Sequence, residues 1–302
     1  MNTFRRAVLI ACLAALLATT TTARIETRPV AYSVLYGAPN EGGRRLDVYV
    51  PEGLEPPYPV VLAFPGSGGD KADIAVFTIP DIAARAGAAT VAVSYATDNP
   101  LMAYADAWCA LAWVQAHGAE YGLNTSRIVT FGHSYGGLPA TMLGVQQDAA
   151  AFAGDCPHNA PDPDSVLGVV TVAGVLLGSA DALEAFDPAA PVWHDANSAE
   201  LLRSTPPEEW LALDLPADQH EFLSQWPMAW INEEDPPHLL VHGGEDTIIP
   251  FENSFAYAEI LTRNRVNATV VTDHYSGHAP PPFTYDRELI VFLERAFDDP
   301  PF

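Results

Sequence analysis

The chain has 302 residues, of which 49% are hydrophobic and 17% are charged, so it can bury a large core and is neither disordered nor fibrous. Its 14 Lys and Arg residues are outnumbered by 38 Asp and Glu residues, which gives a net charge of -24. A surface this acidic repels phosphate backbones and anionic lipid headgroups, so no nucleic acid is expected among its partners.

The first 23 residues are typical of a secretory signal peptide. Arg5 and Arg6 precede an apolar run over residues 7–17, and the small residues at 21–23 suit cleavage by signal peptidase. The apolar run is too short to cross a bilayer comfortably, and no later segment is apolar for long enough to do so. We therefore expect a mature chain of residues 24–302 that is secreted or periplasmic and has no integral membrane association.

Cleavage after residue 23 changes how the cysteines are interpreted. Cys12 would be removed, and Cys109 and Cys156 would remain as an even pair in an oxidising compartment. We expect a disulfide between them, and two buried free thiols are the alternative. Two sequons, at Asn124 and Asn267, would be glycosylated only if the source organism glycosylates its exported proteins.

Short apolar runs alternate with helical patterns along the mature chain. Several runs are apolar at every position, which is typical of strands in a parallel sheet that helices cover on both faces. Strands are expected over residues 46–50, 60–64, 89–93, 128–131, 166–172, 238–241 and 268–271. Helices are expected over residues 104–121, 138–147, 251–262 and 285–297. This alternation predicts an α/β fold with a mostly parallel central sheet and helices on both faces.

The alternation of strands and helices is interrupted over about residues 178–235. We predict that this region is a lid-like insertion within a single domain. It is rich in proline and has 13 acidic residues against one base, Arg203. If the insertion covers an active site, these acids would disfavour an anionic substrate. Alternatively, its tryptophans form a small core of their own and the acids face solvent. The tryptophans are Trp193, Trp210, Trp226 and Trp230.

The sharpest chemical signal is a Gly-x-Ser-x-Gly motif at residues 132–136, which contains Ser134. The motif lies between the strand predicted at 128–131 and the helix predicted at 138–147. A serine on such a turn is held in a strained conformation that lifts its hydroxyl off the sheet edge, and the flanking glycines avoid collisions with neighbouring backbone. We therefore predict that Ser134 is a nucleophile. A serine that only caps the helix is the structural alternative.

A serine hydroxyl needs a base, oriented by an acid, to become a good nucleophile. Asp246 and His278 follow Ser134 in that order, each just after a predicted strand. Because the carboxyl ends of adjacent parallel strands share one edge of a sheet, the three side chains are expected to meet there. His278 would take the proton from Ser134, and Asp246 would hold the imidazole in the required tautomer. His274 and Glu245 are the alternative base and acid.

The tetrahedral intermediate of such a reaction also needs N–H donors for its oxyanion. The amide of Tyr135, directly after the nucleophile, is one candidate. Gly66 and Ser67 are the others, because they lie in a glycine-rich loop after the strand at 60–64 that can turn its amides inward.

Other polar residues near these motifs receive supporting roles. His133 is expected to point away from the site, and His242 is expected to support the loop of the acid through hydrogen bonds. A small group of acids could bind calcium, although a loop of solvated acids is the commoner explanation, and no metal or cofactor is expected. These acids are Asp155, Asp162 and Asp164.

With these motifs the chain resembles the esterase and lipase branch of the α/β-hydrolase superfamily, which includes feruloyl-esterase-like and hormone-sensitive-lipase-like carboxylesterases. The resemblance rests on segments 46–51, 113–122, 132–137 and 236–243 and covers most of the mature chain. One departure concerns the oxyanion loop, where those relatives usually have His-Gly-Gly-Gly and this chain has Pro-Gly-Ser-Gly at 65–68.

The resemblance implies that Ser134, Asp246 and His278 form a triad that acts through an acyl-enzyme. We therefore predict an exported serine hydrolase that cleaves small or polymeric carboxylic esters. A serine peptidase or amidase is the alternative, because the same machinery cleaves amides. A non-catalytic binding module is a further alternative, but it would be expected to lack part of the triad, and this sequence keeps all three residues.

Overall fold

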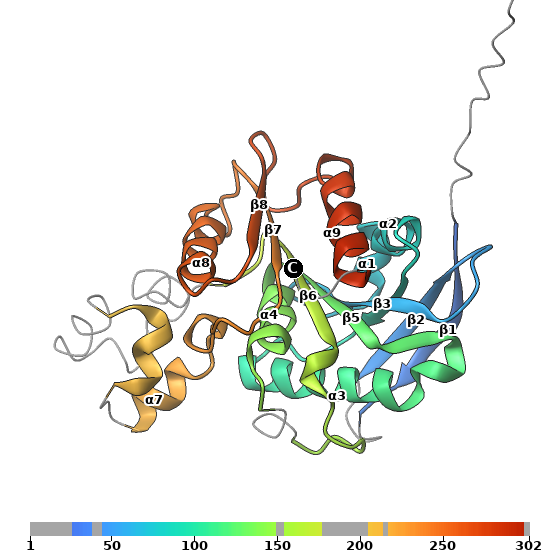
Figure 1. The fold of residues 1–302 in the computed structure, drawn as a ribbon, viewed down its shortest axis with the longest axis horizontal. Helices are drawn as coiled ribbons and strands as arrows, with labels where there is room; N and C mark the ends of the chain where they lie inside the picture. Colours follow the sequence, from blue (N-terminus) through green and yellow to red (C-terminus); the bar gives the residue numbers. More distant parts are fainter. Residues whose placement is uncertain (1–25, 38–43, 149–153, 177–204, 214–216, 299–302) are drawn as a thin grey trace, which may run out of the picture.

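The fold is built on an eight-stranded sheet in the order β1-β2-β4-β3-β5-β6-β7-β8 (Figure 1). It is known from a computed structural model that describes residues 26–37, 44–148, 154–176, 205–213 and 217–298. The predicted signal peptide lies outside these residues. The strands are β1 (Thr27–Leu35), β2 (Arg45–Pro51), β3 (Tyr58–Phe64), β4 (Ala89–Val93), β5 (Leu123–His133), β6 (Val166–Val172), β7 (His238–Gly243) and β8 (Ala268–Asp273).

The six strands from β4 to β8 in the sheet order are parallel, as the apolar runs predict. All five residues of β4 are buried, because the strand has a neighbour on each side and helices on both faces. At the other end of the sheet, β2 pairs in antiparallel fashion with both β1 and β4. The pattern did not predict β1, since this edge strand has no fully buried residue and therefore no continuous apolar run.

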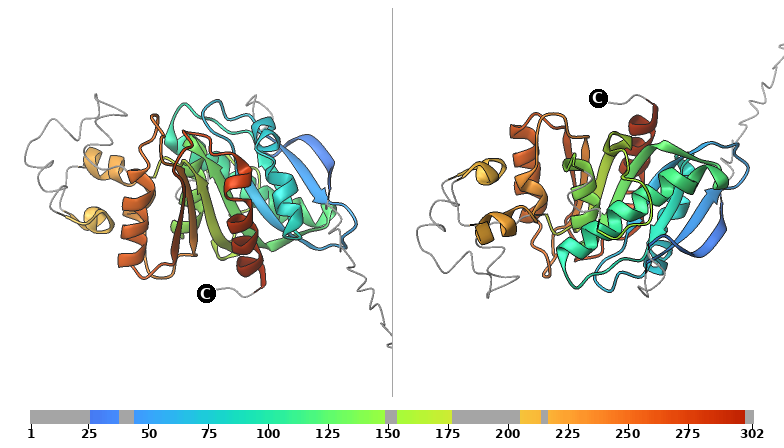
Figure 2. Two further views of the ribbon diagram at one scale, coloured as in Figure 1. Left: turned by 90° about the horizontal axis from the view of Figure 1, so that it is seen from above. Right: turned by 90° about the horizontal axis from the view of Figure 1, so that it is seen from below.

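Helices cover both faces of the sheet (Figure 2). The larger core lies between the sheet and α3, α4 and α8, and the smaller core lies between the opposite face and α1, α2 and α9. The four predicted helices are present within a few residues of the expected bounds, and the short α1 and α2 were not predicted. The helices are α1 (Ala72–Val76), α2 (Ile79–Arg85), α3 (Pro100–His117), α4 (Gly137–Val145), α7 (Ala217–Leu223), α8 (Glu252–Arg263) and α9 (Asp286–Asp298).

The start of α3 illustrates how capping moves a boundary. The sequence pattern predicts this helix from residue 104, but the helix begins at Pro100, because the side chain of Asn99 accepts a hydrogen bond from the amide of Leu101. Asparagine at the cap and proline in the first turn are both favourable positions for these residues. The helix then continues as a short 3-10 turn at Gly118–Tyr121, which accounts for the remainder of the predicted range.

Part of the predicted insertion is described, and it packs against the main core. Its elements are two 3-10 turns, at Pro207–Ala212 and Pro227–Ala229, and α7, which lies at the end of the sheet opposite β1 (Figure 1). Leu223, Trp226 and Met228 are buried in the same core cluster as α3. The described part is thus anchored to the domain, whereas residues 177–204, including Trp193, lie outside the described residues, and a lid function stays a prediction.

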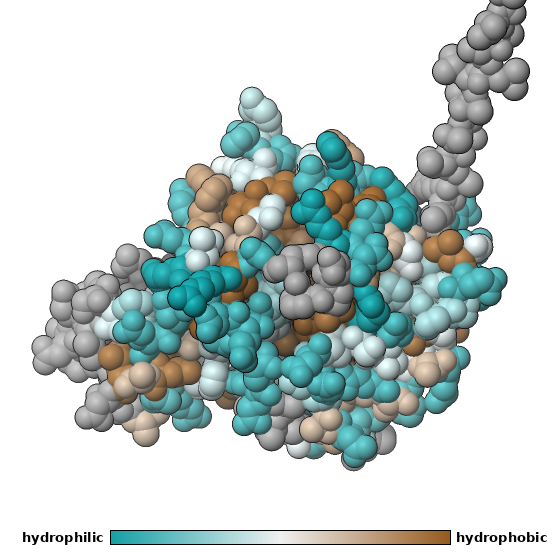
Figure 3. All heavy atoms as spheres, viewed as in Figure 1, coloured by the Kyte–Doolittle hydropathy of each residue, from teal (hydrophilic) through white to brown (hydrophobic). Residues whose placement is uncertain are grey.

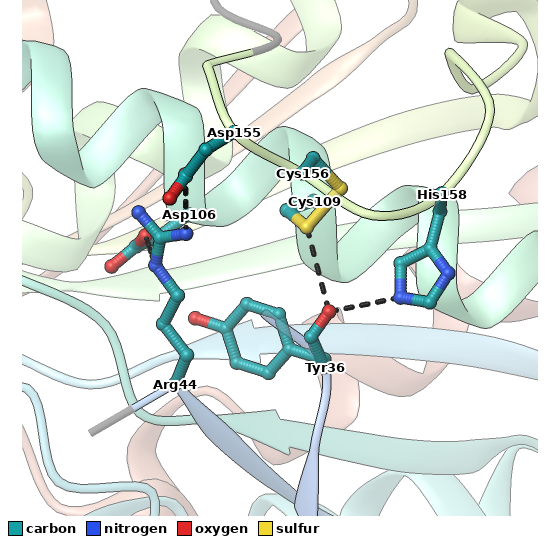
Figure 4. The surroundings of a disulfide bond; sticks show 7 residues. All are labelled: Tyr36, Arg44, Asp106, Cys109, Asp155, Cys156 and His158. Atoms are coloured by element: carbon teal, nitrogen blue, oxygen red, sulfur yellow. Dashed lines mark hydrogen bonds and ion pairs between the residues drawn. A yellow bond between two sulfur atoms is a disulfide. The ribbon is translucent and has the colours of Figure 1, made fainter. Parts of the chain in front are cut away.

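A disulfide joins Cys109 of α3 to Cys156, as the cysteine count predicts (Figure 4). The Cα atoms of the two residues are 5.4 Å apart. The bond therefore ties the segment that follows α4 to a helix of the larger core.

The surface is mostly polar on the face shown in Figure 3, with apolar patches between hydrophilic residues. This agrees with the large excess of acidic residues in the sequence. Among the described residues, no helix combines the length and the apolar character needed to cross a bilayer.

Candidate active site

Ser134 occupies a sharp turn between β5 and α4. Its φ of 53° lies in the left-handed region, a conformation that costs a non-glycine residue of order 1 kcal/mol or more. The neighbouring glycines make the turn possible. A Cβ atom on Gly132 would lie 2.1 Å from the carbonyl oxygen of Gly136, and one on Gly136 would lie 2.3 Å from that of Phe64. The close backbone approach therefore accepts only glycine, as the motif predicts.

The structure brings the three predicted catalytic side chains together at the carboxyl edge of the sheet. Ser134 follows β5, Asp246 follows β7 and His278 follows β8. The Nε2 atom of His278 lies 2.8 Å from the Oγ atom of Ser134, and its Nδ1 atom lies 2.8 Å from Oδ2 of Asp246. Ser134 and Asp246 are buried, whereas the side chain of His278 is 17% exposed, so the base faces the solvent side of the triad.

The carboxylate of Asp246 is surrounded by donors. The amides of Ile248 and Ile249 donate to Oδ1 at 2.8 and 3.0 Å, and the Oδ2 atom faces His278 and His242. Burial raises the pKa of Asp246, but the hydrogen bonds from His278 and from the two amides lower it further, so the net pKa lies below the usual value. The carboxylate is therefore ionised at neutral pH and can stabilise a positive charge on His278.

His242 supports this carboxylate through hydrogen bonds, as expected. Its ring is fully buried, and Nε2 lies 3.1 Å from Oδ2 of Asp246 and 2.9 Å from the carbonyl oxygen of Ile249. Because both neighbours of Nε2 are acceptors, we assign the proton to Nε2, so Nδ1 accepts from the hydroxyl of Ser254 at 2.7 Å. Burial lowers the pKa of His242, which keeps the ring neutral.

His133 lies against the base, and the expectation that it points away from the site is wrong. Its Nε2 atom is 3.2 Å from the carbonyl oxygen of His278, and the two imidazole rings are 5.3 Å apart. The ring also contacts that of Phe77, with centroids 4.5 Å apart. His133 lies at the end of β5, and His278 lies in the loop after β8. The two residues become neighbours only when the folded sheet brings that loop beside the end of β5. Burial lowers the pKa of His133 to about 4.

The alternative base and acid are less suitable. His274 and Glu245 are both exposed, whereas Asp246 is buried beside His278.

Of the acids considered for calcium, Asp155 pairs with Arg44, and the carboxylate of Asp162 accepts a hydrogen bond from the amide of Asp164. Both of these carboxylates thus have partners within the protein.

The predicted oxyanion loop lies next to the serine. We call residues 65–71 the glycine loop. A Cβ atom on Gly66 would lie 3.2 Å from the Cβ atom of Ser134, so the loop backbone passes directly beside the nucleophile. Gly66 is buried and Ser67 is exposed. The donor roles of Tyr135, Gly66 and Ser67 stay predictions.

Two curated relatives share part of this sequence. Esterase LipC of Mycobacterium tuberculosis is 24% identical over 159 residues, which are 52% of this chain and 35% of the relative. Esterase LipI of the same organism is 38% identical over 90 residues, which are 28% of each chain. The chain thus spans about a third of the length of the curated relatives it matches.

Solved structures with the same fold include two esterases. A truncated carbohydrate esterase from gut microbiota is 20% identical, with a TM-score of 0.66 and coverage of 90% of this chain and 97% of that chain. The thermophilic esterase Est2 of the Planctomycetes species Thermogutta terrifontis is 19% identical, with a TM-score of 0.62 and coverage of 92% of each chain. These similarities confirm the predicted α/β-hydrolase fold.

The family assignment rests on a match over more than half of the chain. The BD-FAE family matches residues 46–261, a range that includes Ser134 and Asp246 and ends before His278. The predicted resemblance to the esterase branch of the α/β hydrolases is thereby confirmed, and the chain belongs to the BD-FAE family.

Proposed function

We propose that this chain hydrolyses carboxylic esters through an acyl-enzyme, with Ser134 as the nucleophile. The observation that supports this most directly is the continuous chain of contacts from Ser134 to His278 to Asp246, each 2.8 Å long. Such a chain lets the serine lose its proton while it attacks, which an isolated hydroxyl does poorly at neutral pH.

The proposed reaction has two halves. The Oγ atom of Ser134 attacks the ester carbonyl carbon while its proton passes to Nε2 of His278. The resulting tetrahedral intermediate collapses, the bond to the alcohol oxygen breaks and His278 returns the proton to the departing alcohol. Water then attacks the acyl-enzyme by the same route and releases the acid and free Ser134. The ionised Asp246 stabilises the imidazolium in both halves.

Esters are proposed as substrates in preference to amides. The curated relatives and the structural neighbours described above have names that identify them as esterases. The family match over residues 46–261 includes the nucleophile turn and the acid. These similarities support an ester substrate without specifying its acyl or alcohol group.

The surroundings of the triad favour an uncharged substrate with apolar groups. Ile248, Tyr275 and Phe283 belong to the loops that carry the acid and the base, and they are 63%, 88% and 79% exposed. Exposed apolar side chains on loops that carry catalytic residues offer contact area for an apolar or aromatic group. The net charge of -24 disfavours an anionic ester.

Export of the protein is part of the proposal. The disulfide between Cys109 and Cys156 supports it, because such bonds persist in oxidising compartments and are rare in the cytosol.

A panel of chromogenic esters with increasing acyl length, with aryl amides beside them, tests the activity. We expect Ser134→Ala to lower kcat by about ten-thousandfold or more, because removal of the nucleophile leaves only binding and oxyanion stabilisation. Ser126→Ala is the matched control, since this exposed serine lies near the other end of β5. Ester hydrolysis that survives in Ser134→Ala would rule out the mechanism, and equal turnover of amides would favour an amidase.

A further inference from the structure

The glycine loop is held in place by a second segment, residues 94–96, which follows β4 and which we call the support segment. The hydroxyl of Tyr95 donates to the carbonyl oxygen of Pro65 at 2.6 Å, and the Tyr95 amide donates to that of Gly69 at 3.2 Å. The amide of Lys71 donates to the Ser94 hydroxyl at 3.1 Å. The support segment is thus bonded to the beginning, the middle and the end of the glycine loop.

The two segments are in close backbone contact. A Cβ atom on Gly69 would lie 2.2 Å from the carbonyl oxygen of Tyr95, so this position accepts only glycine. Tyr95 is buried, and its ring packs edge-on against that of Phe64 at a centroid distance of 5.8 Å. Burial raises the pKa of Tyr95, so its hydroxyl stays protonated and remains a donor. Any movement of the support segment would therefore move the glycine loop.

Asp106 of α3 fixes the support segment from the other side. Its Oδ2 atom accepts a hydrogen bond from the amide of Ala96 at 2.8 Å. The hydroxyl of Tyr36 adds a second bond, to the carbonyl oxygen of Ser94 at 2.7 Å. Asp106 is only 2% exposed, and a carboxylate buried this deeply needs a partner of opposite charge.

Arg44 supplies that charge (Figure 4). Its Nε atom lies 2.5 Å from Oδ1 of Asp106, and its Nη1 atom lies 2.9 Å from Oδ1 of Asp155. Asp155 precedes Cys156, whose disulfide partner Cys109 lies three residues after Asp106 on α3. The disulfide thus joins the two chain segments whose carboxylates bind the guanidinium.

We propose that Asp106 and Tyr95 are positioning residues for ester hydrolysis, which hold the glycine loop beside Ser134 through the support segment. The inference rests on the proposed function and on the prediction from the sequence that amides of this loop stabilise the oxyanion. Such donors act only when they lie about 2.7 to 3.1 Å from the oxyanion. A displacement of about 1 Å can cost up to a hundredfold in rate. A loop rich in glycine has little stiffness of its own, so its position must come from the residues that bind it.

The first test is Tyr95→Phe, which removes one buried hydroxyl and keeps the ring against Phe64. We expect kcat for an uncharged aryl ester to fall about tenfold while KM stays within about twofold, because the loop stabilises the transition state more than the bound ester. Amide hydrogen exchange in residues 65–71, followed by mass spectrometry, should become about tenfold faster. A purely structural role would lower the melting temperature without this selective change in kcat and in loop exchange.

The second test compares two variants at Asp106. Asp106→Asn retains an oxygen that can accept from Ala96, so kcat should stay within about threefold of wild type, although the loss of one charged partner of Arg44 lowers the melting temperature. Asp106→Ala removes the acceptor, and kcat should fall about tenfold or more with faster exchange in the glycine loop. Asp235→Asn is the matched control, since this buried aspartate bonds to Asn232 and not to either segment.

The outcomes separate this inference from the proposed function. A folded Tyr95→Phe variant with unchanged kcat or unchanged loop exchange would overturn the inference. If Asp106→Ala does not fold, the Tyr95→Phe variant is sufficient to test the inference. A loss of kcat in Asp235→Asn as large as that in Asp106→Ala would also overturn the inference. Activity that survives in Ser134→Ala would instead remove the proposed function, while the exchange measurement would still report whether the support segment holds the loop.

Discussion

At the scale of single residues, His133 is the side chain whose surroundings lead to a pH prediction. Burial lowers its pKa from 6.5 to about 4. In the unfolded chain the ring gains a proton near pH 6.5, whereas the folded protein resists protonation until about pH 4. Between pH 6.5 and about pH 4 the unfolded state therefore binds more protons than the folded state. The free energy of unfolding decreases as the pH is lowered through this range.

We expect His133→Gln to lose this part of the pH dependence. The contribution of His133 is at most about 3 kcal/mol, from the difference between its two pKa values. Urea denaturation at several pH values between 4 and 7 measures it for both proteins. His238 is also buried with a pKa of about 4, so the variant should keep part of the slope. Parallel curves for wild type and variant would show that His133 titrates normally in the folded protein.

At the scale of elements, the tie between α3 and the segment after α4 should contribute strongly to stability. The disulfide joins residues 47 positions apart, and closing a loop of that length in the unfolded chain is worth about 4 kcal/mol in the chain-entropy model. The double variant Cys109→Ala, Cys156→Ala should lose up to about that much free energy of unfolding, measured in urea. Reduced wild type is the control and should show a similar loss. Two free thiols in unreduced, unfolded wild type would contradict the bond.

The elements also show which patterns a sequence reveals. Strands β3, β4 and β6 are apolar at most positions because two layers of helices cover them, and that pattern is visible in the sequence. The edge strand β1 has only exposed and half-buried residues, so it is stabilised by pairing with β2, which no local pattern records. The short α1 and α2 likewise depend on their position against the sheet.

At the scale of the whole molecule, the net charge of -24 should act on substrate choice. We expect kcat/KM for an ester that bears a carboxylate to rise about two- to tenfold as the ionic strength increases from about 10 to 300 mM, because salt screens the repulsion. The control is the same ester with its carboxylate replaced by a neutral carboxamide, and kcat/KM for this control should change little. An equal response of both esters would show that the acidic residues lie too far from the site to affect it.

The sheet of parallel strands and the turn that holds Ser134 can be predicted from the amino-acid sequence. The sequence also identified Asp246 and His278 as candidates, because glycine spacing, apolar runs and chain order are local properties. The contact of His133 with His278 and the burial of Trp226 in the main core are visible only in the folded protein. The same holds for the buried pair of Asp106 and Arg44. These arrangements depend on contacts between segments far apart in the chain, and such contacts form only when the sheet brings the segments together.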